Sequence, residues 1–434
     1  MQSLIKGFSK LSREEKVQVL IEQQHLVPEL SDRFKQFLHP DKQYLFDDIS
    51  ENIISNFYLP FSLAPNFLVN DELYIVPMVI EESSVVAAAS KAAGFWAKNG
   101  GFQTRVINTI KNGQIHFKWT GDIAELQKYK DELFQLILKV TESITNKMRQ
   151  RGGGIVDMQL KSIPNMANTH QALIQFKTAD SMGANFINTC LETIAPQLVS
   201  FINEHHELRA EVPASVIMSI LSNYTPECLV ECKISAGIEQ LQPYAGRYSA
   251  HEFAQRFKTA VDIAINDPYR AVTHNKGIFN GIDAVVLATG NDFRAIEAGA
   301  QAYASRNGTY ASLTQMDLSE KQFEYTLEVP LAMGTVGGLT QTHPLAKAAM
   351  EILQQPSAEQ LMQIAAAAGM ANNFGAVASL VTTGIQKGHM KLHLSNVLNA
   401  LNATQNEKTA ATKHFKDSVV SYSMVESFLQ ELRN

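Results

Sequence analysis

The chain has 434 residues, of which 45% are hydrophobic and 18% are charged, and its formal net charge at pH 7 is −6. This length exceeds one ordinary hydrophobic core and predicts two domains, and the composition excludes a disordered chain. The negative charge, without any basic run, argues against nucleic-acid binding. Because we find no signal peptide and no apolar run of transmembrane length, we expect a soluble, cytoplasmic protein with no membrane partner.

Three cysteines, Cys190, Cys228 and Cys232, are too few for a disulfide framework. The last two lack the spacing and the companion ligands of a zinc site. We therefore expect both thiols in the core, and we expect no metal site.

Residues 1–50 are predicted to be helical, because Ser12 and Glu15 form a capping box in front of apolar residues at helical spacing. A strand is predicted at residues 74–80, bounded by loops.

Glu81 and Glu82 follow this strand and stand at the start of an Ala-rich helix. One interpretation is helix capping, because the helix dipole favours anions at this end. Alternatively, a carboxyl group that leads a buried helix has its pKa raised by desolvation and donates a proton near neutral pH.

Residues from about 110 to 220 are predicted to form a separate unit. One long amphipathic helix is expected from Asp122 to Arg149, and the expected strands are residues 114–119, 155–163 and 171–178. This order has βαβ character and predicts an α+β sandwich of a small sheet and two helices. No Gly-x-Gly-x-x-Gly follows a strand, so the unit lacks the Rossmann fingerprint.

The loop that opens the last helix of this unit is a candidate phosphate site. Backbone N–H groups and the dipole at a helix N-terminus attract anions, although an ordinary helix cap explains the small residues equally well. The candidate cofactor-binding residues are Asp180, Ser181, Met182, Gly183, Ala184 and Asn185.

The densest run of polar side chains lies at residues 267–294. Residues 284–288 are predicted to form a short buried strand with a loop at its end, and such loops often carry function. Gly277 and Gly281 flank Asn280, a pattern typical of backbone that turns or approaches a ligand closely.

Lys276 and Asp292 are the candidate chemical residues of this run. A lysine beside a carboxylate in a partly dry site stays charged and can stabilise a developing alkoxide. A solvated lysine and a turn aspartate are the alternative, but the density of polar residues between glycines favours a site.

Residues 333–339 are a glycine-bearing loop that either lines a ligand or makes a structural turn. Further on, His389 and His393 are spaced to share a helix face, but a metal site needs a third ligand. A single histidine that titrates as an acid or base is the preferred interpretation.

Taken together, several stretches resemble the class II 3-hydroxy-3-methylglutaryl-CoA reductase family, in the family's order over nearly the whole chain. The matching segments are residues 51–54, 77–90, 182–185, 270–292 and 337–340, together with His389. The resemblance implies reduction of 3-hydroxy-3-methylglutaryl-CoA to mevalonate and CoA, in isoprenoid biosynthesis, with two NADPH or NADH and no metal. It also implies a homodimer, or a higher even oligomer, with active sites at the subunit interface.

The implied fold class is α+β. A large, mostly helical domain that binds the CoA thioester would comprise residues 1–110 and 221–383. A small α/β sandwich without Rossmann topology, residues 111–220, would be inserted in it and bind the dinucleotide. Residues 384–434 would form a helical flap.

The resemblance also assigns roles to side chains. The implied catalytic residues are Glu82, Lys276, Asp292 and His389, and the implied substrate-binding residues are Ser84, Arg270, Asn280, Asn223 and Asn372. Lys276 would stabilise the thioester oxyanion, His389 would protonate the departing thiolate, and Glu82 would protonate the final alkoxide. Asp292 would hold Lys276 charged, and Arg270 would pair with the carboxylate of the substrate.

NADPH is the predicted preference. In the family pattern, relatives that prefer NADH are acidic six residues before the glycine run at 152–154, and a carboxylate repels a 2′-phosphate. Asn146 holds that position here and Lys147 follows it, so both are candidate cofactor-binding residues. The alternative is that the basic residues only complement a helix C-terminus.

Three positions depart from the family pattern and concern loop geometry and CoA contacts. Ser83 replaces a common proline, Ser55 replaces a glycine of the dimer motif, and Asn372 replaces a glutamine near the flap hinge.

Three other functional hypotheses are the same enzyme run oxidatively on mevalonate, a non-catalytic CoA-thioester-binding protein, and a metal-dependent hydrolase built on His389 and His393. The presence of all four implied catalytic residues argues against a simple binding protein.

Overall fold

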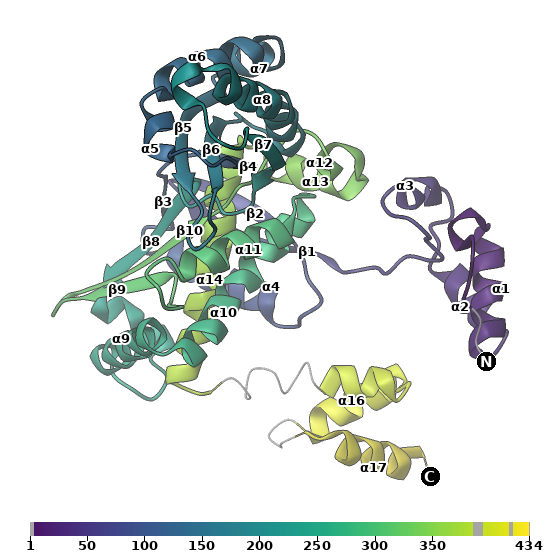
Figure 1. Ribbon diagram of the computed structural model, residues 1–434. Coiled ribbons are helices and arrows are strands. Elements are labelled where there is room, and N and C mark those ends of the chain that lie inside the picture. Colours follow the sequence, from purple (N-terminus) through teal and green to yellow (C-terminus); the bar gives the residue numbers. More distant parts are fainter. Residues whose placement is uncertain (1–3, 385–393, 416–419, 434) are drawn as a thin grey trace.

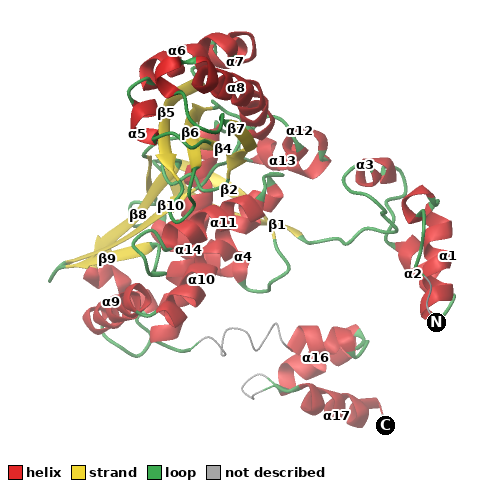
Figure 2. Ribbon diagram, in the orientation of Figure 1, coloured by secondary structure: helices red, strands yellow, loops and turns green. Residues whose placement is uncertain are grey.

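The computed structural model describes residues 4–384, 394–415 and 420–433 (Figure 1). Short helical segments near the two ends of the chain lie apart from a larger body that holds both four-stranded sheets (Figures 1 and 2). The buried apolar side chains form three separate clusters, one in the large body, one in a small sheet unit and one in the C-terminal helices. The predicted domain boundaries at 110, 220 and 383 stay predictions.

The N-terminal segment is helical, as predicted. It contains η1 (Phe8–Lys10), α1 (Arg13–Gln24), α2 (Leu30–Gln36) and α3 (Gln43–Asp47). The predicted capping box is confirmed, because the Ser12 hydroxyl accepts from the Glu15 N–H and the Glu15 carboxylate accepts from the Ser12 N–H. An ion pair of 2.5 Å between Arg13 and Asp47 links α1 to α3.

The large body combines an antiparallel hairpin, an antiparallel sheet in the order β3-β8-β10-β9, and helices packed against them. Its strands are β1 (Phe61–Val69), β2 (Glu72–Val79), β3 (Gln103–Val106), β8 (Leu229–Gly237), β9 (Thr314–Leu318) and β10 (Gln322–Pro330). Its helices are α4 (Val85–Trp96), η3 (Ile238–Tyr244), α9 (Ala250–Asn266), α10 (Pro268–Ala288), α11 (Phe293–Ala304), α12 (Leu339–Thr342), α13 (Pro344–Ile352) and α14 (Ala358–Val381). The strand predicted at 74–80 is confirmed as β2, and Cys228 and Cys232 are buried as predicted.

Helix α14 is the centre of this body and contacts α4, α9, α10 and β8. Contrary to our expectation, its apolar stretch is long enough to cross a membrane by length and composition. However, 72% of that stretch is buried inside the protein, as in a core helix of a soluble fold. Its all-round burial explains why no amphipathic pattern marks it in the sequence.

The predicted strand at residues 284–288 is wrong, because these residues form the last turns of α10. Asp267 caps this helix through the Tyr269 N–H and Pro268 occupies its first turn, so the helix starts firmly and continues through the apolar run. Gly281 is helical as well, and a Cβ there would collide with the Ala368 carbonyl of α14. The glycine thus serves close helix packing and not a turn.

The small unit is a four-stranded antiparallel sheet in the order β5-β6-β4-β7 with helices on one face (Figure 2). Its strands are β4 (Lys111–Lys118), β5 (Gly154–Ser162), β6 (Thr169–Lys177) and β7 (Ser215–Ser222). Its helices are α5 (Ile123–Gln127), α6 (Lys130–Val140), α7 (Glu142–Arg149), α8 (Ala184–Glu204) and η2 (His206–Leu208). The βαββαβ order with this strand arrangement is the ferredoxin-like, split βαβ topology. The sheet is not parallel, which agrees with the missing Rossmann fingerprint.

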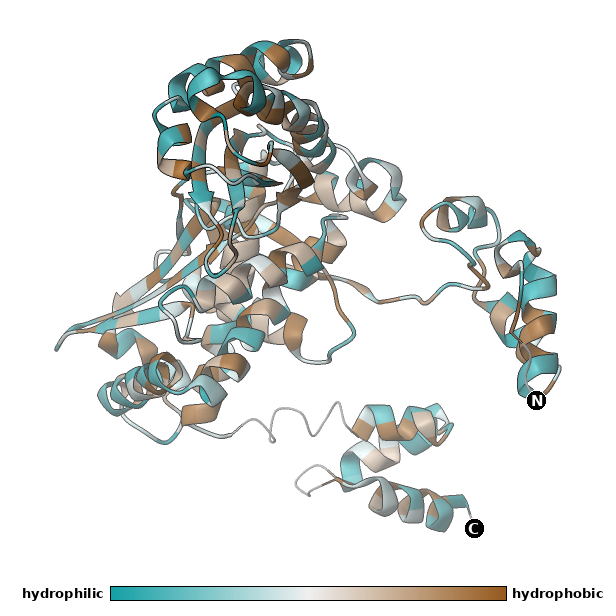
Figure 3. Ribbon diagram, viewed as in Figure 1, coloured by the Kyte–Doolittle hydropathy of each residue, from teal (hydrophilic) through white to brown (hydrophobic). Residues whose placement is uncertain are grey.

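The predicted single helix from Asp122 to Arg149 is wrong, because the segment is divided into α5, α6 and α7. At the second break, the buried Thr141 hydroxyl donates to the Ile137 carbonyl, an interaction that competes with regular helix bonding. Each short helix still presents both apolar and hydrophilic residues, which suits a layer that covers a sheet (Figure 3).

The C-terminal helices comprise residues 394–400, α16 (Gln405–His414) and α17 (Tyr422–Arg433), around their own apolar cluster. The Arg433 guanidinium bonds the Glu407 carboxylate at 2.6 Å and holds the pKa of that carboxyl at about 2. His389 and His393 lie outside the described residues.

Candidate active site

Lys276 of α10 forms an ion pair with Glu82, in the turn between β2 and α4. Ser84, the N-cap of α4, has a left-handed backbone with φ of 76° and makes no side-chain capping bond. Capping therefore does not explain these acidic residues, and the turn directs Glu82 toward α10. The Lys276 side chain is 58% exposed and that of Glu82 is 36% exposed, so the pair is open to a ligand.

Asp292 caps α11, and its Oδ1 accepts from the Arg294 and Ala295 N–H groups at 3.1 and 3.2 Å. The Arg294 guanidinium also bonds this carboxylate. Among the described residues, Asp292 makes no ion pair with Lys276, so their predicted coupling stays a prediction.

Asp283 is an acidic group that the sequence interpretation missed. It lies seven residues after Lys276 on α10 and therefore on the same side of the helix. Burial, and then the neighbouring Glu297 and Glu81 carboxylates, raise the pKa of Asp283 to about 8. The sequence does contain a sign of this group, because an acidic residue between Ile282 and Ala284 interrupts an apolar run.

Arg270 is half-buried on another side of α10, near a buried polar network. The His274 imidazole lies 2.7 Å from the Thr314 hydroxyl, and the Tyr325 hydroxyl bonds both Thr314 and Asn373. Burial, and then the Arg270 charge, lower the pKa of His274 to about 3, so this imidazole is neutral. Burial also lowers the pKa of Arg270. In the described chain no carboxylate pairs with Arg270, which leaves it available to an anion.

A cavity of about 410 Å³ lies between the start of α8, the loop after α10 and the glycine-bearing loop at 334–338. Hydrogen bonds connect these three segments, since the Gly334 N–H donates to the Asn291 Oδ1 and the Thr335 N–H donates to the Asp180 carbonyl. We call this cavity the α8 groove. Its lining residues are Ser181, Met182, Gly183, Ala184, Asn185, Phe186, Gly290, Asn291, Asp292, Gly334, Val336, Gly337, Gly338 and Thr340.

The α8 groove brings together five of the six predicted residues at 180–185. The exception is Asp180, whose Oδ1 accepts from the Ala358 N–H at 2.9 Å and so holds the start of α14. Of the predicted loop at 333–339, residues Gly334, Val336, Gly337 and Gly338 line the groove, and its ligand-lining role stays a prediction.

The remaining predicted substrate residues are in different surroundings. The Ser84 hydroxyl is buried without a hydrogen-bond partner in the described chain, and Asn280 is half-buried one turn after Lys276. Asn223 lines a second, very small cavity with Lys111 and Met182. By contrast, Asn372 is buried within α14 and its Nδ2 donates to the Ala368 carbonyl.

Asn146 and Lys147 are both exposed near the C-terminal end of α7. The glycine turn that follows this helix packs against Met148 and the Lys177 carbonyl, where a Cβ at Gly153 would not fit. Lys177 directly precedes the turn that leads to α8, so α7 ends near that turn.

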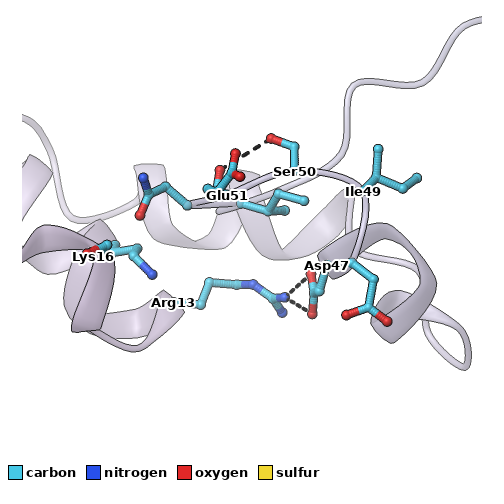
Figure 4. A pocket seen from close by; sticks show the side chains of 10 residues that line it. Arg13, Lys16, Asp47, Ile49, Ser50 and Glu51 are labelled. Atoms are coloured by element: carbon cyan, nitrogen blue, oxygen red, sulfur yellow. Dashed lines mark hydrogen bonds and ion pairs between the residues drawn. The ribbon is translucent and has the colours of Figure 1, made fainter. Parts of the chain in front are cut away.

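A separate cavity of about 530 Å³ lies in the N-terminal segment (Figure 4). Arg13 and Asp47 form its ion pair, and residues 49–53 form one of its sides. This side includes part of the segment at 51–54 that resembles the dimer motif of the family.

Comparisons with known proteins point to one family. A family model described as hydroxymethylglutaryl-coenzyme A reductase matches residues 13–394. The whole chain is 35% identical to 3-hydroxy-3-methylglutaryl-coenzyme A reductase of Archaeoglobus fulgidus, covering 96% of that protein. A probable 3-hydroxy-3-methylglutaryl-coenzyme A reductase of Borreliella burgdorferi is 30% identical over 89% of this chain and 86% of its own.

Solved structures of the class II enzyme from Streptococcus pneumoniae share the fold. One, bound to NADPH in open conformations, has a TM-score of 0.71 and 36% identity and covers 87% of this chain and 99% of its own. Another has a TM-score of 0.71 and 35% identity and covers 98% of this chain and 99% of its own.

These matches and the fold define a mixed α/β, NAD(P)H-dependent oxidoreductase with antiparallel sheets. The chain belongs to the hydroxymethylglutaryl-coenzyme A reductase family, and its function is that of the reductase of the mevalonate pathway. The predicted family, activity and nicotinamide cofactor are thereby confirmed. The roles of individual residues, the choice of NADPH and the oligomeric state stay predictions.

Proposed function

We propose that the chain reduces 3-hydroxy-3-methylglutaryl-CoA to mevalonate at a site built on Lys276, Glu82 and Asp292, with NADPH as the preferred cofactor. The ion pair between Lys276 and Glu82 carries this proposal, because it places a cation and a carboxyl group on facing elements. The test is to mix the purified protein with the CoA thioester and reduced nicotinamide and follow the cofactor absorbance. An absence of thioester-dependent oxidation refutes the proposal.

The reaction places negative charge on the substrate oxygen twice. When bound, the reduced nicotinamide supplies hydride for both reductions. Lys276 stabilises the thioester oxyanion, since a charged donor aimed at a developing oxyanion lowers the barrier. Glu82 then delivers the proton that the final alkoxide needs.

Arg270 suits the free carboxylate of the substrate, because a planar guanidinium binds a carboxylate through two parallel hydrogen bonds. The half-buried position of Arg270 and its lack of a carboxylate partner within the described residues support this role. The unpartnered Ser84 hydroxyl and Asn280 are then donors for the remaining substrate oxygens.

His389 is the proposed acid for the thiolate leaving group. An imidazole titrates near the working pH and can protonate sulfur as CoA departs. A flap made from residues 384–434 would bring it over the site and keep water from the aldehyde.

The dinucleotide is assigned to the α8 groove. Gly183 has a φ of 89°, and a Cβ there would collide with the Thr178 side chain, so the small residues are needed for the close turn. The free N–H groups at the start of α8 suit a pyrophosphate. Lys147 and Asn146 extend the site toward a 2′-phosphate.

A basic pocket of about 500 Å³ beside α4 suits the phosphorylated end of CoA. It is lined by Lys91 and Lys98, which stand on or just after the helix that starts at the Ser84 turn. A thioester held near Glu82 would extend its long arm along this helix. Replacement of both lysines by alanine should raise KM for the CoA thioester but not for free mevaldehyde.

A homodimer, or a higher even oligomer, in the cytoplasm is the proposed form of the enzyme. Segment 51–54 and its apolar neighbour Phe57, which is 92% exposed, would be covered in the assembly. We assign no metal to the site, and among the described residues no cluster of metal-ligating side chains is found.

A further inference from the structure

Lys111, the first residue of β4, is a buried lysine that the reaction does not use, and only 4% of it is exposed. Its ammonium donates to the Thr178 Oγ1 at 2.6 Å and to the Ser181 carbonyl at 3.2 Å. Both acceptors are uncharged, and no carboxylate of the described chain bonds this ammonium. Burial lowers the pKa of Lys111, because the charged form loses its hydration. A buried cation without an ion-pair partner costs folding free energy, so its presence needs a reason.

The position of this cation is specific. Ser181 belongs to the wall of the α8 groove, and Lys111 bonds its carbonyl oxygen. Lys111 also lines the very small cavity that includes Met182, another residue of the groove wall. The Ser181 backbone therefore lies between the Lys111 ammonium and the groove, and Lys111 itself does not line the groove.

The loop does not depend on Lys111 for its hydrogen bonds. The Thr178 hydroxyl donates to the Ser181 carbonyl at 2.7 Å, and the Ser181 N–H donates to the Thr178 carbonyl at 3.0 Å. The Asp180 carbonyl accepts from the Thr335 N–H at 2.8 Å, which attaches the loop to the large body. The distinctive contribution of Lys111 is therefore its charge.

We propose that Lys111 is a concealed electrostatic positioning residue for the dinucleotide, which offsets the charge of the pyrophosphate from behind the α8 loop without touching it. Its field adds to that of the N-terminus of α8, and low local polarity strengthens both. The anion in turn compensates the buried ammonium. This inference rests on the proposed assignment of the dinucleotide to the α8 groove.

The test compares Lys111→Gln and Lys111→Met with the wild type. Glutamine keeps an N–H donor for the same acceptors but removes the charge, and methionine removes both. The dissociation constant of NADPH is measured from the fluorescence of the reduced nicotinamide, together with the unfolding midpoint and KM for the CoA thioester. We expect about tenfold weaker NADPH binding in both variants, or about 1.4 kcal/mol. KM for the thioester should stay within about twofold.

Stability separates a functional charge from a structural one. An unpaired buried charge costs folding free energy, so the Lys111→Met midpoint should not fall. A lower midpoint with unchanged NADPH binding overturns the proposal. Wild-type binding in Lys111→Gln also overturns it, as does failure of both variants to fold, because Lys111 would then serve the fold.

Lys177→Met is the matched control, because it removes an exposed lysine one residue before the same turn. A loss of NADPH affinity equal to that of Lys111→Met would assign the effect to diffuse surface charge and overturn the proposal.

Asn185→Asp places a carboxylate in the groove wall and tests the groove itself. If it alone weakens NADPH binding, the groove assignment stands and the role of Lys111 fails. If neither Asn185→Asp nor Lys111→Met has an effect, the groove assignment fails as well.

Discussion

Lys276 forms an ion pair with Glu82 although 194 residues separate them in the chain. The small unit is inserted between these two residues, so the pair joins the parts of the large body that precede and follow it. The contact between β2 and α10 makes the pairing possible, because Glu82 stands in the turn just after β2. The pair therefore forms only when β2 and α10, which are distant in sequence, pack against each other.

Lys276→Met should lower the rate of thioester reduction by about 100- to 1,000-fold, since loss of one oxyanion partner has effects of this size. Steady-state rates with both substrates at saturation check this expectation. Lys258→Met is the control, because Lys258 also holds a carboxylate, Asp262 at 2.8 Å, but on α9. A loss below about threefold in Lys276→Met would contradict the assigned role.

Much of the site could be predicted because its residues lie in short local patterns. Glu82 stands between a strand and an Ala-rich helix, and Lys276 lies in a polar run. The meeting of distant segments could not be predicted. The α8 groove is built from three segments spread over residues 181–340, and hydrogen bonds hold these segments together. Such contacts depend on the whole fold and leave no local pattern.

The two errors in secondary structure have a common cause. Local apolar spacing predicts a strand at residues 284–288 and one helix from Asp122 to Arg149, but tertiary packing gives a helix end and three helices instead. A helix buried on all sides has no amphipathic period, so its apolar end is indistinguishable from a buried strand. Breaks between amphipathic helices leave the period almost intact, so three helices are mistaken for one.

Asp283→Asn should change how stability depends on pH. Folding raises the pKa of this carboxyl from 3.8 to about 8, so the folded wild type holds a proton that the unfolded chain releases. The stability of the wild type should therefore fall as pH rises from about 4 to about 8. Asparagine removes this dependence of the unfolding free energy on pH and should stabilise the protein by roughly 1–3 kcal/mol near pH 8.

Urea unfolding of both proteins across this pH range checks the effect. Asp262→Asn, which alters an exposed carboxylate on α9, is the control and should leave the slope of the wild type unchanged. Equal slopes in wild type and Asp283→Asn would show that Asp283 is ionised in the folded protein.

His389→Gln should separate the two half-reactions. The thiolate departs only in the first, so thioester reduction should slow by about 100- to 10,000-fold while mevaldehyde reduction stays nearly intact. His393→Gln is the matched control. Equal losses in both half-reactions would remove His389 from the role of thiol acid.

Ile53→Asp should dissociate the proposed dimer, because a carboxylate in a covered apolar segment is costly. Sedimentation at the assay concentration should show the wild type as a dimer, or a higher even oligomer, and the variant as a monomer with little activity. Leu26→Asp, at an exposed position outside segment 51–54, should leave the assembly intact. A fully active wild-type monomer would refute interfacial active sites.

The cofactor preference depends on Asn146 and Lys147 at the end of α7. A neutral amide beside a cation tolerates and attracts a 2′-phosphate, whereas an acidic residue would repel it. Both side chains are exposed and free to meet a ligand, while Arg149 lies 3.7 Å from Glu142 and is partly neutralised. We therefore expect the ratio of kcat/KM for NADPH to that for NADH to exceed one and to fall about tenfold, or about 1.4 kcal/mol, in Lys147→Ala.

Lys139→Ala removes a similar exposed lysine from the last turn of α6 and should not change the ratio. A tenfold wild-type preference for NADH, or a ratio unmoved by Lys147→Ala, would leave this basic cluster as helix-end charge alone.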